Sequence, residues 1–330
     1  MTDTARALWY TAPRAAELRP NPLPPLHAGW VEVETCASAL SRGTERLVWE
    51  GRVPSGEHSR MRAPFQQGDF PFPVKYGYAA VGRVVAGDAR LIGRTVFALH
   101  PHQDRIRLPA SSVLPVPEGV PPGRAVLAAN METALNAIWD AAPALAPGAR
   151  VAVIGMGLLG LLVMALLSRR EDLEVTACDI LPEREALAAE FGVKFRNPGE
   201  LVPDHDLVFH TSATAAGLAA GLGALRFEGT LIELSWYGDA AVPAPLGGAF
   251  HSQRLTIRSS QVGHVAPTRR VRVTHRERLS RALALLDDPR VDAFVTGEVT
   301  FEALPGALAG LLAPGAAGIA TRVAYGREAV

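Results

Sequence analysis

The stretch Arg150-Val-Ala-Val-Ile-Gly155-Met-Gly157-Leu-Leu-Gly160 decides the fold of this chain. Its apolar first part predicts a buried strand, and the apolar residues from Leu158 onward predict a helix. A glycine motif at such a strand-to-helix turn has a clear use. Gly155 permits the tight turn, Gly157 lets the backbone approach a pyrophosphate, and Gly160 lets helix and strand pack closely. The unpaired N–H groups at Leu158 and Leu159 and the positive end of the helix dipole favour that pyrophosphate, so the motif predicts a dinucleotide site.

A carboxylate follows at the end of the next predicted strand, residues 174–178. Asp179 stands 24 residues after Gly155. There it can accept hydrogen bonds from the adenosine ribose hydroxyls and would repel a 2′-phosphate. We therefore expect NAD in preference to NADP. Two alternatives remain open: Asp179 only caps the turn at Leu181-Pro182-Glu183, or the glycine-rich turn holds no ligand.

Strands and helices alternate from about residue 126 onward. The pattern predicts helices at 125–142, 158–169, 183–191 and 215–225, and strands at 150–154, 174–178, 207–210, 230–234 and 255–258. Such alternation predicts an α/β fold with a doubly wound parallel sheet, the Rossmann arrangement. A helix at about 277–286 and a strand at 321–325 end the pattern.

The first 125 residues have a different sequence pattern. Short alternating runs at 31–34, 81–85 and 95–99 predict strands, and proline-bearing runs such as 19–25 separate them. This part is typical of an irregular β barrel. We expect three segments: 1–125 in the barrel domain, 126–263 in the dinucleotide domain, and 264–330 returning to the first domain.

Composition excludes several classes of partner. Of the 330 residues, 48% are hydrophobic, and 33 Lys and Arg balance 33 Asp and Glu, so a nucleic-acid partner has no electrostatic support. The two cysteines, Cys36 and Cys178, form no motif, which fits a reducing compartment. The N-terminus has no apolar signal core, and the apolar stretch 158–167 is too short to span a bilayer. We expect a cytoplasmic protein without a membrane or nucleic-acid partner.

Taken together, the β-rich first part, the central dinucleotide domain and the short return resemble the medium-chain dehydrogenase/reductase superfamily over nearly the whole chain. The resemblance implies a GroES-like catalytic barrel, a small-molecule substrate, and a homodimer or homotetramer that pairs edge strands such as 255–258. Four segments are similar to the branch that contains 3-hydroxyethyl bacteriochlorophyllide dehydrogenase: 41–45, 72–78, 100–103 and 257–263. This narrower similarity implies NAD-dependent interconversion of a secondary alcohol, such as a polyol or cyclitol, and its ketone.

The zinc ligands of the superfamily are missing. Ser41-Arg-Gly-Thr-Glu45 stands where relatives have a Cys-Gly-Thr-Asp-like segment, and Gly77-Tyr78-Ala79 stands for Gly-His-Glu. The segment 128–133 offers no thiol for the third position. Because zinc needs three or four such ligands, we expect no metal. A replacement site built from His100 and His102 with Glu45 is the alternative.

Without zinc, side chains must stabilise the developing alkoxide and move its proton. The resemblance places Tyr78 in the emptied metal position, so it is our first acid/base candidate, with Lys75 as the cation that lowers its pKa or as the proton donor itself. Thr44 matches the hydroxyl that begins the proton relay in zinc relatives. Glu45 and Arg42 orient this network or form an ion pair, and His102 is a weaker relay candidate.

The resemblance also gives positions for further cofactor contacts. Thr133 and Ser235, the latter in Ser235-Trp236-Tyr237, are expected beside the nicotinamide, Ser212 near the riboses, and Arg322 at the pyrophosphate. The basic run 269–278 is either a solvated face or a rim that attracts an anionic substrate. Two other functions stay open: a zinc-independent quinone or enoyl reductase, which Asp179 disfavours because that group prefers NADPH, and a non-catalytic dinucleotide-binding protein.

Overall fold

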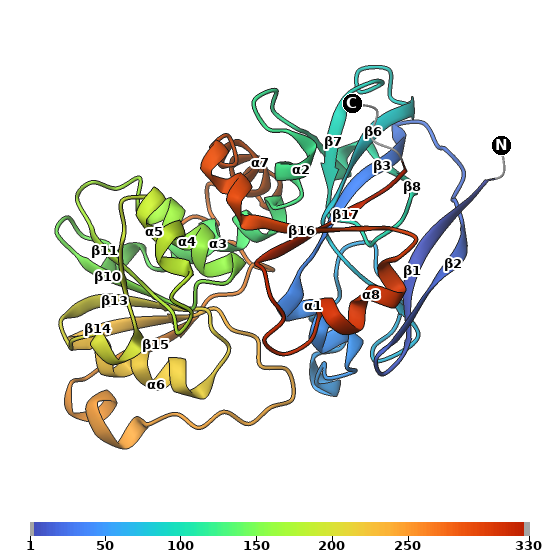
Figure 1. Ribbon diagram of the computed structural model, residues 1–330. Helices are drawn as coiled ribbons and strands as arrows, with labels where there is room; N and C mark the ends of the chain where they lie inside the picture. The colour runs from blue at the N-terminus through green and yellow to red at the C-terminus, as the bar shows by residue number, and fades with distance from the viewer. Residues whose placement is uncertain (1–2, 327–330) are drawn as a thin grey trace. The chain divides into compact units, whose positions relative to one another are not determined.

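The computed structural model describes residues 3–326, which form two compact units (Figure 1). One unit contains the residues up to Ala129 and those from Leu283 onward, and the other is Asn130–Ala282. No helix in the described range is both long enough and apolar enough to cross a membrane.

A six-stranded parallel sheet forms the centre of the second unit. Its order is β12-β11-β10-β13-β14-β15. The strands are β10 (Arg150–Ile154), β11 (Glu174–Cys178), β12 (Lys194–Arg196), β13 (His205–His210), β14 (Leu225–Glu233) and β15 (Thr256–Ser259). The helices are α3 (Ala128–Asp140), α4 (Leu158–Leu167), α5 (Arg184–Glu190), α6 (Ala215–Ala224) and α7 (His275–Leu285). Helices α4 and α5 lie on one face of the sheet and α6 on the other (Figure 1). The predicted doubly wound sheet is confirmed, and β15 is an edge strand as expected.

Burial on both faces explains the apolar sequence of the central strand. Val151, Ala152 and Val153 in β10 are fully buried, so no polar position alternates with them. Gly160 lets α4 approach β10, because a Cβ atom there would lie 1.8 Å from the carbonyl oxygen of Gly155. The strand order reverses between β10 and β13, and a doubly wound sheet binds its ligand at this switch point.

The first unit is built from two largely antiparallel sheets. One has the order β2-β1-β5-β4, and the other has the order β16-β17-β3-β6-β7-β9 with β8 also paired to β3. The strands of the first sheet are β1 (Thr4–Ala12), β2 (Ala15–Pro22), β4 (Gln67–Gly68) and β5 (Val74–Lys75). Those of the second are β3 (Trp30–Leu40), β6 (Ala80–Gly87), β7 (Thr95–Ala98), β8 (Arg105–Pro109), β9 (Val113–Pro115), β16 (Val295–Thr300) and β17 (Ala320–Ala324). Three helices accompany them: α1 (Arg42–Trp49), α2 (Pro122–Ala125) and α8 (Leu304–Leu311).

Several elements of the first unit differ from the sequence prediction. The proline-bearing run was expected to separate strands, but β2 extends to Pro22. This is possible because β2 lies at the edge of its sheet, where a proline need not donate to the ladder. Helix α1 was not predicted. The single helix expected at 125–142 is divided into α2 and α3.

The return to the first unit comes later than predicted. Residues 264–282 belong to the second unit, whereas the sequence suggested that they had already left it. Arg278 of α7 gives the physical reason, because its side chain is 1% exposed and bonds to α3. The guanidinium donates to the Glu132 carboxylate at 2.9 Å and to Asn136 Oδ1 at 2.6 Å. This buried ion pair holds α7 against α3.

We expect loss of one partner of this pair to destabilise the protein. Arg278→Met leaves Glu132 buried without its cation and should lower the free energy of unfolding by about 3–5 kcal/mol. The double variant Glu132→Leu with Arg278→Met leaves no unpaired charge and should recover most of that loss. Denaturant unfolding followed by circular dichroism measures both variants. An Arg278→Met protein as stable as the wild type would contradict the prediction.

Candidate functional site

The predicted site residues fall into two groups, one in each unit. The first group lies at the carboxyl edge of the parallel sheet in the second unit. The other is a polar cluster at the start of α1 in the first unit. The two groups are described separately.

The glycine loop after β10 has the conformation expected for a phosphate cradle. Gly155 has φ +98°, and a Cβ atom there would lie 2.7 Å from the backbone nitrogen of Ser212. Gly157 has ordinary backbone angles as the N-cap of α4, and a Cβ atom at this position would meet nothing within 4 Å. The fold therefore needs glycine at Gly155, whereas the space beside Gly157 stays open for a ligand at the start of α4.

Asp179 serves the loop as well as the adjoining turn. Its Oδ2 accepts the N–H of Met156, inside the glycine loop, at 2.5 Å. Its Oδ1 accepts the N–H of Leu181 at 2.9 Å, so the turn-capping interaction that we kept as an alternative is present. Each carboxylate oxygen has a further lone pair. The partly exposed side chain can therefore still accept hydrogen bonds from ribose hydroxyls.

A hydrogen-bonded relay at the ends of β13 and β14 was not predicted. His210 and Glu233 are register partners and the last residues of their strands. Glu233 Oε2 lies 2.8 Å from His210 Nδ1, and His210 Nε2 lies 2.7 Å from Ser212 Oγ. Since the carboxylate can only accept, Nδ1 carries a proton and donates it to Glu233. A signal was available in the sequence, because a histidine closes the strand predicted at 207–210 and a glutamate stands one residue before the end of the strand predicted at 230–234.

Other groups hold both ends of this relay. The Glu233 carboxylate also accepts the N–H of Ser235 at 2.8 Å and the hydroxyl of Tyr237 at 3.1 Å. Burial raises the pKa of Glu233, but the hydrogen bonds from His210 and Ser235 outweigh it and the net pKa is lowered. Thr214 Oγ1 lies 2.9 Å from Ser212 Oγ at the other end. The orientation of the Ser212 hydroxyl is thus fixed on both sides.

Glu45 is the centre of the polar cluster in the first unit. Its carboxylate is fully buried and accepts the Tyr10 hydroxyl at 2.7 Å, the Ser41 N–H at 2.7 Å and His102 Nε2 at 3.0 Å. His102 Nδ1 lies 2.7 Å from Ser38 Oγ. The predicted residues Glu45 and His102 are therefore in direct contact. Glu45 does not pair with Arg42, whose guanidinium donates to the carbonyl oxygens of residues 316–318.

Tyr78 lies against the residues that begin α1. Its hydroxyl donates to Ser41 Oγ, and Thr44 also hydrogen-bonds to it. Burial raises the pKa of Tyr78 to about 12. The expectation that Lys75 lowers this pKa is wrong, because the Lys75 ammonium donates to Gln103 Oε1 at 2.8 Å instead. Tyr78 is therefore equipped to donate a hydrogen bond rather than to act as a base near neutral pH.

Lys75 is a buried amine whose pKa is lowered. Its side chain is 1% exposed, and burial lowers its pKa to about 8. His100 is buried nearby, and burial together with the charge of Lys75 lowers its pKa to about 3, so the imidazole is neutral. A neutral imidazole and a weakly basic amine are both compatible with proton transfer at ordinary pH.

The donor set of the cluster does not fit zinc. Ser41 and Tyr78, which stand at two ligand positions of the zinc relatives, hydrogen-bond to each other. Residues 3–326 contain no group of three or more His, Cys, Asp and Glu side chains that could hold a metal ion. The alternative site of His100, His102 and Glu45 is not formed either, because both ring nitrogens of His102 are engaged by Ser38 and Glu45.

Two further cofactor candidates lie on different units. Thr133 is half-buried in α3 of the second unit. Arg322 in β17 of the first unit forms an ion pair with Glu298, its register partner in β16. The cofactor contacts proposed for both residues stay predictions.

Comparison with known proteins identifies the fold. No family model and no curated protein matches the chain. Among solved structures, it is similar to L-idonate 5-dehydrogenase from Escherichia coli K-12 (15% identity, TM-score 0.77, 98% of this chain and 99% of that one). It is also similar to a protein named as a zinc-binding dehydrogenase from Sinorhizobium meliloti 1021, bound to NADP (15% identity, TM-score 0.75, 97% of this chain and 99% of that one). A third similar structure is named as a short chain alcohol dehydrogenase from E. coli CFT073, complexed with NADH (14% identity, TM-score 0.74, 98% of this chain and 99% of that one). The chain therefore has the Rossmann plus GroES-like fold of the medium-chain alcohol dehydrogenases, as the motifs predict.

Proposed function

We propose that the protein is an NAD(H)-dependent dehydrogenase that interconverts a secondary alcohol and its ketone without zinc. The observation that carries this proposal is the glycine loop at the sheet switch point, with open space beside Gly157 and a carboxylate at Asp179. Solved structures of the same fold with bound NADP and NADH support it.

The glycine loop and Asp179 would hold the adenosine and pyrophosphate part of the cofactor. The N-terminus of α4 supplies backbone N–H groups and a positive dipole end for the pyrophosphate. The Asp179 carboxylate would accept the ribose hydroxyls and repel a 2′-phosphate, so we infer a preference for NAD. The nicotinamide supplies hydride transfer when the cofactor is bound. The same carboxylate disfavours the alternative of an NADPH-dependent quinone or enoyl reductase.

The relay of Ser212, His210 and Glu233 would position the other half of the cofactor. Asp179 follows β11, on one side of the switch point, so the nicotinamide half is expected on the side of β13 and β14. Ser212 lies there, packed against Gly155. His210 and Glu233 act through Ser212, because they hold its hydroxyl in one orientation and leave its remaining lone pair for the cofactor.

The polar cluster in the first unit would manage the proton of the alcohol. Lys75 is our candidate for the general base, since its pKa is lowered to about 8. Tyr78, whose pKa is raised to about 12, would keep its proton and stabilise the alkoxide by hydrogen bonding, together with Thr44. Glu45 and His102 are positioning residues that hold Ser41 and the start of α1. This assignment needs no metal ligand.

We also propose a homodimer or homotetramer that pairs β15 edges. The edge position of β15 and its exposed Ile257 support this proposal. Assembly through a sheet edge is one common way to cover such a strand.

The proposed function predicts turnover of a secondary alcohol with NAD. A panel of secondary alcohols, cyclitols and sugars should give NADH absorbance at 340 nm with NAD, and much less with NADP. Metal analysis of the same preparation should give substoichiometric zinc, and chelation should leave turnover unchanged. Tightly held stoichiometric metal with loss of turnover on chelation would contradict the zinc-free site. Tight NADH binding without turnover of any alcohol, ketone or enone would favour a non-catalytic binding protein.

The proton assignment predicts a pH profile that depends on Lys75. A base must be neutral to accept the alcohol proton, so kcat/KM for oxidation should rise with pH and level off above about 8. Lys75→Met should lower this rate by about 10²–10⁴-fold and remove the inflection. Tyr78→Phe should lower the rate but keep the inflection. Lys194→Met, a substitution of the only other lysine, which is exposed, is the control. An inflection that survives in Lys75→Met would refute the assignment.

The relay predicts weaker binding of NADH to His210→Asn. The asparagine amide can still donate to Glu233, but no atom replaces Nε2 beside Ser212, so we expect about tenfold weaker NADH binding by fluorescence titration. AMP, which lacks the nicotinamide half, should bind as to the wild type. His205→Asn is the matched control, because this buried histidine of β13 makes its described contacts through Nδ1 alone. Equal losses in the two variants, or none in His210→Asn, would argue against the relay.

A further inference from the structure

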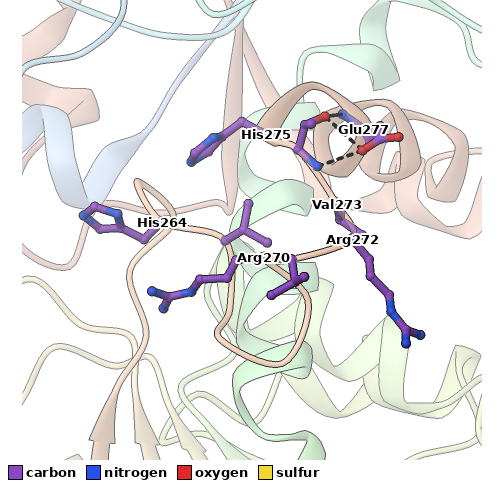
Figure 2. Close-up of a pocket in the computed structure, with 9 residues that line it drawn as sticks. His264, Arg270, Arg272, Val273, His275 and Glu277 are labelled. Carbon is purple, nitrogen blue, oxygen red and sulfur yellow. Dashed lines mark hydrogen bonds between the residues drawn. The ribbon is translucent and has the colours of Figure 1, made fainter.

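A hollow of about 560 Å³ lies in the second unit, beside the start of α7 (Figure 2). Its volume is within the range of small-molecule sites. None of its residues belongs to the groups described above. The lining residues are His264, Val265, Arg270, Val271, Arg272, Val273, Thr274, His275 and Glu277.

Positive and proton-accepting groups dominate this hollow. His264, Arg270 and His275 extend toward the same side, whereas Arg272 extends away from them (Figure 2). Glu277 is the one acidic residue of the lining, and its carboxylate is already engaged. It accepts the Thr274 N–H at 2.7 Å and the Thr274 hydroxyl at 3.0 Å, as part of the cap of α7. The hollow therefore presents the Arg270 guanidinium and two imidazoles, and its lining has no free carboxylate.

No direct contact holds the guanidinium groups of Arg270 and Arg272 among residues 3–326, although the charge of Arg270 acts on the Asp140 carboxylate, which lies outside the lining of the hollow. Neither forms a hydrogen bond or an ion pair there, whereas the buried Arg278 on the same segment is bonded on all sides. Free guanidinium groups are ordinary on a protein surface. Here, however, Arg270 extends to the same side of a hollow as two imidazoles, which is an arrangement suited to an anion.

Hydrogen bonds from buried side chains hold the backbone of the segment that carries these groups. Arg278 donates to the carbonyl oxygens of His264, at 3.1 Å, and of Val262. Asn136 Oδ1 accepts the N–H of Ala266 at 3.0 Å. The side chains of Val265 and Val273 are buried. Since the backbone of the hollow is held in place by α3 and α7, little ordering would be needed when a ligand binds.

We propose that this hollow binds a small molecule through a phosphate group. A guanidinium matches phosphate oxygens with paired N–H donors, and the imidazole of His264 adds a donor from another direction. The His275 ring is already held in place, because its Nε2 lies 3.0 Å from the Gly263 carbonyl oxygen. The α7 dipole directs its positive end to the same place. The proposal is independent of the dehydrogenase assignment and of the glycine loop, which is a separate phosphate cradle.

Titration of the full-length protein with inorganic phosphate tests this inference by isothermal calorimetry. We expect saturable binding to the wild type and at least tenfold weaker binding to Arg270→Gln. Arg269→Gln is the matched control, because it removes the same charge from the neighbouring residue, which is exposed, does not line the hollow and lies over the Trp139 ring. Gly157→Asp fills and charges the glycine loop, and it should leave phosphate binding at the hollow unchanged.

Three outcomes would overturn the proposal. Failure of phosphate to saturate the wild type would mean that the hollow holds no site. Equal weakening in Arg269→Gln and Arg270→Gln would show diffuse attraction by the basic segment. Loss of binding in Gly157→Asp would place the phosphate at the glycine loop. Melting temperatures of all variants, compared with the wild type, separate these results from unfolding.

Discussion

The burial of the Glu45 carboxylate is the constraint on which the first unit depends. A carboxylate without solvent is strongly destabilising unless several donors reach it. Here the donors come from β1, from the residue before α1 and from the loop between β7 and β8, through Tyr10, Ser41 and His102. One charge thus joins three segments that are distant in sequence. Ser41 Oγ also accepts a hydrogen bond from the Tyr78 hydroxyl. The Glu45 carboxylate, by holding Ser41, therefore determines the position of the proposed proton chemistry.

The second unit follows the same rule with other residues. His210 and Glu233 close neighbouring strands, and each is buried against the other. Arg278 and Glu132 join α7 to α3 in the same manner. In both places a polar pair takes a position that an apolar pair could fill. Each pair also holds a neighbouring group in place. The first orients Ser212, and the second holds the backbone of His264.

The sequence was informative where one residue type had one physical use. The glycine motif and the apolar strand β10 could be read directly, because tight turns and buried parallel strands each restrict the residues allowed. The ribose contact of Asp179 stays a prediction, and its observed contacts are the N–H groups of Met156 and Leu181. Helix α1 could not, since it is short and its residues serve the Glu45 network. The pKa of Tyr78 was mispredicted because sequence proximity placed Lys75 beside it, whereas the fold turns that amine toward Gln103. The boundary at 264 was missed because only the folded chain shows that Arg278 is buried against α3.

Asp179 has a consequence for any attempt to redesign coenzyme choice. Under the proposed function, deletion of this carboxylate would remove the charge that repels a 2′-phosphate. In this protein the deletion would also release the amide of Met156 and the turn at Leu181. Asp179→Asn would remove the charge, but its single amide oxygen can accept only one of these two N–H groups, and its NH2 group would face the other. Under the proposed function, coenzyme preference and loop geometry therefore depend on the same side chain.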